Sequence, residues 1–243
     1  MKDGYCLKAW WSHRRRSRET CARRIERFLC RLREIDPRFE NLHEVGRSMA
    51  QPIGAPIGRT ANEIAQQLEE NERSPDLGYS LYAVLPDESI GVDIRDGIWS
   101  KYNPPNRVFV EFEGGLSEEL VELLTTDRLS RMLISVVEIF HPDWGGVETR
   151  KHLEMVGLMG TVPYASWMLY LPRRVEELPP LPSGVEVRPV GESGVLIVTV
   201  QERFLVNNPD HVRLAAEITN RLTAAGILSE PKEEERVKRN DND

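Results

Sequence analysis

Two stretches of the chain place apolar residues at steps of three and four, which is the spacing of one face of an α-helix. In the first stretch, after Ser17, these positions are Cys21, Ile25, Phe28, Leu29, Leu32 and Ile35. Ser17 is a favourable N-cap, and Asp36-Pro37 is a dipeptide at which helices end. In the second stretch, from about Asp127 to Phe140, the positions are Leu129, Met132, Leu133, Val136, Val137 and Phe140.

Three further helices are predicted from their capping residues. Thr60, three residues before a glutamate, fits a capping box and predicts a helix to about Glu72. Ser117 precedes a first turn rich in glutamate, which favours a helix start. Asn208-Pro209 is typical of an N-cap followed by proline at the first helical position, and Gly226 is a typical helix stop.

Segments rich in β-branched and aromatic residues, bounded by turn residues, predict strands in the rest of the chain. These segments are Tyr5–Trp11, Tyr79–Leu85, Gly91–Trp99, Arg107–Glu113, Trp144–Thr149, Pro163–Leu171, Gly184–Val190 and Gly194–Gln201. The last two flank a glycine-bounded turn and predict a hairpin. Because neighbouring strands are joined by short turns, we expect antiparallel pairing. Residues 38–59, where proline and glycine alternate, are expected to be irregular.

Together these elements predict an α+β fold, in which a largely antiparallel sheet packs with several helices. A chain of 243 residues is long enough for one large domain, and we expect a single domain over residues 1–228. From there the sequence is polar and charged, so residues 229–243 are expected to form a disordered tail.

The middle strands carry the clearest candidate for a binding surface. Alternation places Phe109, Glu111 and Glu113 on one face of their strand, opposite the apolar residues. If the neighbouring strand lies alongside, Asp93 joins them on one open face. An aromatic ring among carboxylates is typical of a docking surface for a basic partner, although an ordinary solvated sheet face has the same pattern. The candidate partner-binding residues are Asp93, Phe109, Glu111, Glu113, Asp143 and Trp144.

Charge is distributed unevenly along the chain. Residues 1–35 contain eleven Lys or Arg and four Asp or Glu, whereas the remaining residues contain 21 basic and 35 acidic side chains. The net charge of −7 therefore comes from an acidic body that follows a basic first segment. An acidic body repels nucleic-acid phosphate and favours a basic partner.

The motifs of common catalytic and metal sites are missing from this sequence. The three cysteines include no Cys-x-x-Cys pair and are expected to be small core residues without disulfides. The five histidines show no ligand spacing, and Gly114-Gly115 lacks the residues of a phosphate-binding loop. Asp143, Glu148 and Lys151 are not spaced like a magnesium nuclease site, in which one residue separates Glu from Lys. We therefore expect no enzyme activity, cofactor or metal.

Two other classes of partner are disfavoured. The arginines at 14–16 and 18 do not continue as a basic stripe, so we expect no nucleic-acid binding and interpret them as a solvated helix start that pairs with acidic residues. No apolar run reaches the roughly 20 residues of a membrane helix, and the N-terminus does not look like a signal peptide. We expect a cytoplasmic protein.

Several segments, in order, resemble the immunity protein 52 family of bacterial polymorphic-toxin systems over about residues 4–228. The matching segments are Trp10-Trp11, Cys21–Arg24, Ile35–Pro37, His141–Trp144, Ser166–Leu171, Gly194–Thr199, Phe204, Asn208–Val212 and Leu222–Leu228. The resemblance implies a non-catalytic protein that neutralises a cognate toxin encoded beside it. Toxins linked to such families have a restriction-endonuclease-like fold and are delivered by machinery such as type VI secretion, so the implied partner is a DNase effector. The alternatives are a non-catalytic adaptor unrelated to toxins and an enzyme with an unfamiliar site.

Overall fold

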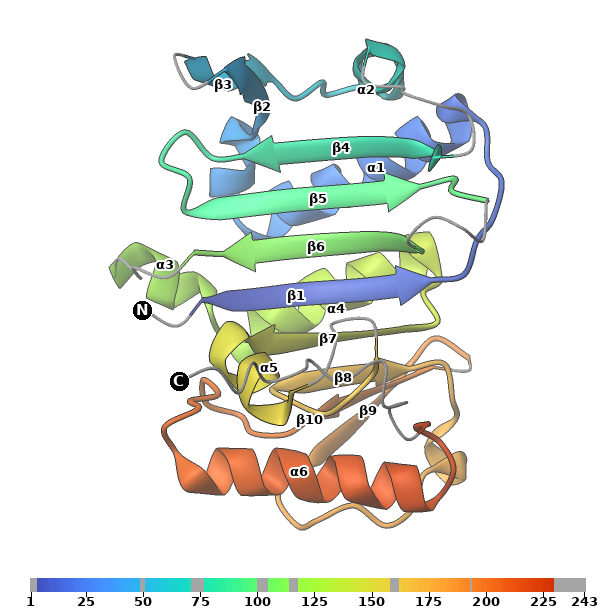
Figure 1. Cartoon of the computed structure of the whole chain (residues 1–243), viewed down its shortest axis with the longest axis vertical. Coiled ribbons are helices and arrows are strands. Elements are labelled where there is room, and N and C mark those ends of the chain that lie inside the picture. The colour runs from blue at the N-terminus through green and yellow to red at the C-terminus, as the bar shows by residue number, and fades with distance from the viewer. Residues whose placement is uncertain are drawn as a thin grey trace, which may run out of the picture.

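The computed structural model describes residues 4–48, 51–70, 77–99, 105–113, 118–157, 162–192 and 194–229. The strands form a ten-stranded sheet in the order β3-β2-β4-β5-β6-β1-β7-β8-β10-β9, and all recorded pairs are antiparallel (Figure 1). The strands are β1 (Tyr5–Trp11), β2 (His43–Ser48), β3 (Gln51–Pro56), β4 (Tyr79–Val84), β5 (Ile90–Asp96), β6 (Asn106–Phe112), β7 (Trp144–Thr149), β8 (Met168–Leu171), β9 (Glu186–Val190) and β10 (Gly194–Val198). The predicted α+β class with a largely antiparallel sheet is confirmed.

The helices predicted from Ser17, Thr60 and Asn208 begin directly after these capping residues. They are α1 (Arg18–Ile35), α2 (Ala61–Glu70), α3 (Glu118–Leu123), α4 (Thr126–Phe140), α5 (Arg150–Val156) and α6 (Pro209–Ala224). The Ser17 hydroxyl accepts the N–H of Thr20 at 3.3 Å, and the Asn208 side chain accepts the N–H of Asp210 at 3.1 Å. Thr60 and Glu63 exchange hydrogen bonds as a capping box.

The two faces of the sheet are covered differently. In Figure 1, α1 and α4 lie behind the sheet, and α6 lies in front of its lower end. The larger apolar core joins the rear face of the sheet to residues of α1 and α4. A second core lies beneath α6, where Ile218 and Leu222 pack with Val195 and Ile197 of β10. Within the described residues, no helix covers the front of β4, β5 and β6.

A buried ion pair fixes α1 to the rear of the sheet. Arg24 of α1 forms a short hydrogen bond with Asp96, the last residue of β5, whose side chain is fully buried. The same guanidinium donates to the carbonyls of Ile139 and Phe140 at 3.1 and 3.0 Å, at the end of α4. One arginine therefore joins two helices to one strand.

Several sequence expectations were wrong. Residues 38–59 contain a 3₁₀-helix over Pro37–Asn41 and the strands β2 and β3, rather than an irregular segment. Those strands pair through register shifts at the edge of the sheet, where proline and glycine are tolerated. The strand predicted over Pro163–Leu171 is confined to β8, and α5 was not predicted.

Two side chains also differ from expectation. Arg24 is a charged residue of α1, and it is nevertheless buried because Asp96 compensates its charge. Cys30 is exposed rather than part of the core, whereas Cys21 is buried as expected, and all three cysteines are free. The predicted tail lies outside the described residues from residue 230 onward. Within the described chain, none of the helices has the length and apolarity needed to cross a bilayer.

Candidate functional site: an uncovered sheet face with a pocket

Strand register brings residues of β5, β6 and β1 together on the front face. Asp93 of β5 lies opposite Phe109 of β6, which lies opposite Lys8 of β1. In the next row, Glu111 of β6 lies between Gly91 of β5 and Cys6 of β1. The predicted gathering of Asp93, Phe109 and Glu111 on one face is therefore present, because alternation is maintained along both strands.

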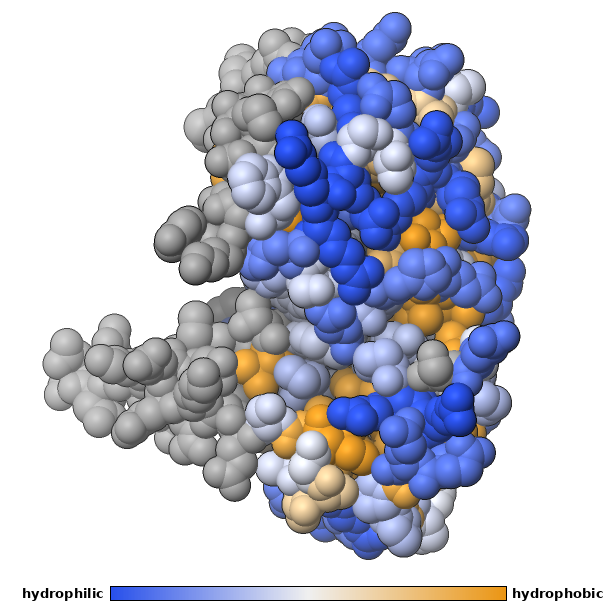
Figure 2. Space-filling model, turned by 90° about the vertical axis from the view of Figure 1, so that its right-hand side faces the viewer, coloured by the Kyte–Doolittle hydropathy of each residue, from blue (hydrophilic) through white to orange (hydrophobic). Residues whose placement is uncertain are grey.

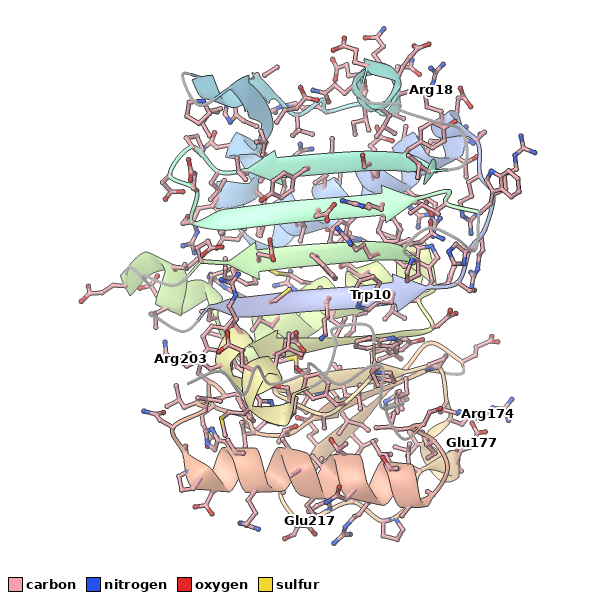
Figure 3. All side chains as sticks on the ribbon, viewed as in Figure 1. Trp10, Arg18, Arg174, Glu177, Arg203 and Glu217 are labelled. Atoms are coloured by element: carbon pink, nitrogen blue, oxygen red, sulfur yellow. The ribbon has the colours of Figure 1, made fainter. Side chains whose placement is uncertain are left out.

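An aromatic pair occupies the centre of this face. The rings of Trp10 and Phe109 meet edge to face with centroids 5.0 Å apart, and Figure 3 shows Trp10 on β1 among the central strands. The Arg107 guanidinium lies 4.8 Å from the Phe109 centroid and 5.7 Å from that of Trp10. Phe109 is half-buried and Trp10 is buried, so Phe109 presents the accessible part of the pair.

The carboxylate of Asp93 is compensated by arginines. Arg107 donates to its Oδ2 from Nη2 at 2.6 Å and from Nε at 3.0 Å, and Arg95 lies 3.7 Å from its Oδ1. Both Asp93 and Arg107 are mostly shielded from solvent, since their side chains are 13% and 17% exposed. Asp93 therefore orders this surface and adds little net negative charge to it.

A buried polar cluster lies beside the aromatic pair. The Lys8 ammonium is 2.5 Å from Oε2 of Glu148 on β7, and Tyr164 donates a short hydrogen bond to the same oxygen. The ammonium also lies 5.0 Å from the Tyr164 ring centroid and 5.2 Å from that of Trp144. Burial, followed by the nearby Glu148 charge, raises the pKa of Tyr164, so this hydroxyl remains protonated at neutral pH.

A pocket of about 190 Å³ opens above this cluster. Its residues come from β1, β6, the end of β7 and α5, and include Cys6, Lys8, Phe109, Glu111, Glu148 and Leu153. Glu113 and Arg150 also line it, and their exposed side chains approach each other to 4.0 Å. The structure thus brings three predicted residues, Phe109, Glu111 and Glu113, to one pocket.

Glu111 differs from the other carboxylates of this pocket. Among the described residues, no group forms a hydrogen bond or ion pair with it. Its carboxylate lies above Gly91, since a Cβ built there would be 3.9 Å from Oε2 of Glu111 and 3.7 Å from the Tyr82 hydroxyl. Burial, and then the charge of Glu113, raises the pKa of Glu111. Glu111 is therefore a half-buried carboxylate whose charge is poorly compensated.

The remaining two predicted residues lie at the far end of β1. Asp143 accepts the N–H of Ser12 at 2.6 Å and lies 3.4 Å from Arg14, and its own N–H donates to the Trp10 carbonyl. It remains half exposed beside the arginine-rich connection. Trp144 is 7% exposed and packs in the core beneath α6, so it supports the surface from below.

The arginine-rich connection behaves as the sequence predicted. Arg14 approaches Asp143, Arg16 lies 3.7 Å from Asp96, and Arg18 lies 2.7 Å from Glu69 of α2. Figure 2, a view of the side on which this connection runs, shows mostly hydrophilic residues with smaller hydrophobic patches between them. The cations are distributed among acidic partners rather than forming one patch.

Sequence reasoning missed Lys8, Glu148 and Tyr164. Their association depends on the pairing of β1 with β7 and on a loop residue distant in sequence, which no local pattern reveals. A lysine in the middle of an aromatic strand was the available signal, because a buried lysine requires an acidic partner. In the described part of the chain, His, Cys, Asp and Glu form no group of three or more that could hold a metal ion.

Comparison with known proteins adds a family to this geometry. A family model described as Immunity protein 52 matches residues 3–231. The solved structure of "Pseudomonas aeruginosa T6SS protein PA0821" superposes with a TM-score of 0.53 at 15% identity, covering 90% of this chain and 73% of that chain. At this identity the likeness concerns the fold. No curated protein matches the chain.

Proposed function

Because this chain belongs to the immunity protein 52 family, we propose that it binds and neutralises a cognate secreted toxin in the cytoplasm of the cell that makes it. The proposed role needs binding without turnover. The observation that supports a binding role is the front of β4, β5 and β6, which no helix covers within the described residues, since sheets usually bury one face and expose the other only to solvent or to a partner.

The proposed contact surface is the front face around Phe109, with Asp93, Glu111 and Glu113 beside it. Interfaces commonly have an aromatic centre with charged residues at their rim. Here Phe109 is held by Trp10 and Arg107, so little side-chain freedom would be lost on binding. Asp143 is a further candidate at the end of β1, and Trp144 would act by supporting Trp10 and Lys8.

The toxin is proposed to be a nuclease with a restriction-endonuclease-like fold, delivered by type VI secretion. The nuclease part follows from the family resemblance, and the fold shared with a Pseudomonas T6SS protein agrees with the secretion system. The acidic net charge of −7 suits a partner whose groove binds phosphate. The immunity protein would cover that active site or block an assembly that the toxin needs.

The test is co-purification of this protein with the product of the adjacent toxin gene, followed by a DNA-cleavage assay. We expect a stable complex and loss of cleavage when the two proteins are mixed in equal amounts. A complex without any effect on cleavage or on toxin-dependent killing would instead favour an adaptor role. The absence of a complex would refute neutralisation by direct binding.

A further inference from the structure

The pocket beside Phe109 is suited to one side chain rather than to a small molecule. Its volume of about 190 Å³ is below the ~300–1,000 Å³ of typical ligand sites. Phe109 and Leu153 provide apolar walls, and Glu111 provides a charge between the floor and the rim. Lysine and arginine side chains have this combination of an apolar stem and a charged head.

The ion pairs in and beside the pocket indicate which charge a partner would have to supply. At the floor, Glu148 compensates Lys8, and at the rim Arg150 approaches Glu113. Next to the pocket, Asp93 is held by Arg107. Glu111 remains without such a partner among the described residues, so the pocket lacks one positive charge rather than one negative charge.

The charges that line the pocket also determine how deeply a cationic side chain would insert. The floor of the pocket offers a second cation little attraction, because the Glu148 carboxylate is already paired with Lys8 and accepts a hydrogen bond from Tyr164. Glu111 is half-buried and lies nearer to solvent than Glu148. A cationic head would therefore be held at the level of Glu111, with its stem against Phe109.

We propose that this pocket receives one lysine or arginine side chain of the toxin, and that its cationic head pairs with the Glu111 carboxylate. The proposal rests on the proposed function and identifies the part of the partner that the front face recognises. In the complex, the free-energy cost that this poorly compensated carboxylate imposes on the free protein would be recovered.

Several charged or titratable groups surround Glu111. They are Tyr82 on β4, Asp93 on β5, Arg107 and Glu113 on or after β6, Cys6 and Lys8 on β1, and Glu148 and Arg150 on β7 and α5. The acidic neighbours raise the pKa of Glu111, while Arg150 and Arg107 lower it. An incoming cation would add to the second group and lower the pKa further.

The test compares Glu111→Gln with Glu113→Gln. The second variant is the matched control, because Glu113 lies two residues further along the chain, is exposed and already lies near Arg150. The probe is the purified product of the adjacent toxin gene, and its dissociation constant is measured by calorimetry. We expect Glu111→Gln to weaken binding at least about tenfold and Glu113→Gln less than about threefold, because loss of a desolvated charge pair costs more than loss of an exposed one. Equal effects of the two variants, or an unchanged dissociation constant for Glu111→Gln, would overturn the proposal.

Two further measurements separate recognition from a structural role. Glu111→Gln should unfold at the same denaturant concentration as the wild type or at a higher one, because it removes an uncompensated charge. By NMR of labelled glutamate, the pKa of Glu111 should fall when the toxin binds, whereas a pKa that stays the same or rises would contradict cation docking. A wild-type chain that fails to bind the toxin would refute the proposed function. Tight wild-type binding that Glu111→Gln does not weaken would refute this inference alone.

Discussion

The two ends of the sheet use strands of different composition. In β8 and β10 every residue is buried, and successive residues enter opposite cores: Met168 and Tyr170 face one, Leu169 and Leu171 the other. In β6, buried residues alternate with half-buried ones. A strand covered on both faces is continuously apolar, and a strand covered on one face alternates. The alternating half is therefore the half with a surface free for a partner.

This difference predicts that one half of the sheet mainly stabilises the fold and that the other half mainly contacts the partner. The half beneath α6 is held by apolar contacts on both faces, whereas the half formed by β4, β5 and β6 depends on one helical layer and on buried polar anchors. Substitutions in the first half should lower stability and leave the affinity of the folded fraction unchanged. Substitutions on the front of the second half should lower affinity with a small effect on stability.

The largest loss of stability is expected for Arg24→Met, which removes the buried ion pair between α1 and Asp96 of β5. The substitution leaves Asp96 buried without its main partner, and breaking a buried pair in this way costs about 3–5 kcal/mol. Urea unfolding would measure the loss. The double variant Arg24→Met with Asp96→Asn should recover part of it, and a double variant as unstable as the sum of both single variants would contradict the pairing.

Leu222→Ala on α6 tests the covered half. Leu222 is fully buried in the second core, and truncation of such a side chain costs about 2–5 kcal/mol. The toxin affinity of the remaining folded protein should match that of the wild type, since no residue of α6 lines the pocket. A change in affinity larger than about threefold would show that the two halves are coupled.

A pH-dependent loss of stability is expected from His152 on α5. Burial, and then the nearby Lys8 charge, lowers its pKa from 6.5 to about 4. Between these values the unfolded chain binds more protons than the folded chain, so stability falls as the pH drops from 6.5 to about 4. The expected loss is on the order of 3 kcal/mol.

His152→Asn provides the comparison for that titration. Nδ1 of His152 shares a hydrogen bond with Ser166 Oγ at 2.9 Å, and an asparagine amide could replace it. The variant should be less stable than the wild type at pH 7, but its free energy of unfolding should decline less between pH 6.5 and 4.5. Equal declines in both proteins would assign the acid sensitivity to other groups.

Local signals in the sequence predicted much of the fold. Caps such as Ser17 and Asn208 fixed helix starts, and the 184–201 hairpin formed β9 and β10 as expected. The strands β2 and β3 were missed because edge strands accept prolines that argue against strands elsewhere. The match of the family model over residues 3–231 agrees with the resemblance seen along the same stretch.

The sequence predicted which residues share the candidate face, but it did not predict the ion pairs that these residues form. Alternation was enough to place Asp93, Phe109 and Glu111 on one face. Whether each carboxylate is compensated depends on Arg107, Lys8 and Arg150, which reach the site from other strands and from a helix that had not been predicted. A face that looked uniformly acidic in sequence is therefore largely balanced, with Glu111 as the exception among the described residues.

A small loss of stability, about 1 kcal/mol, is expected for Phe109→Ala, because the ring is half-buried and its edge contact with Trp10 contributes modestly. Its effect on toxin binding should be at least about tenfold, since a rigid aromatic at the centre of an interface commonly carries much of the affinity. Tyr82→Ala is the matched control: Tyr82 is 47% exposed, on the same face but at β4, beyond Glu111. Loss of affinity for Phe109→Ala alone would confine the contact to the pocket, whereas equal losses would extend it across β5 to β4. Unchanged affinity in both variants would show that the toxin binds elsewhere and that the uncovered face is ordinary solvated surface.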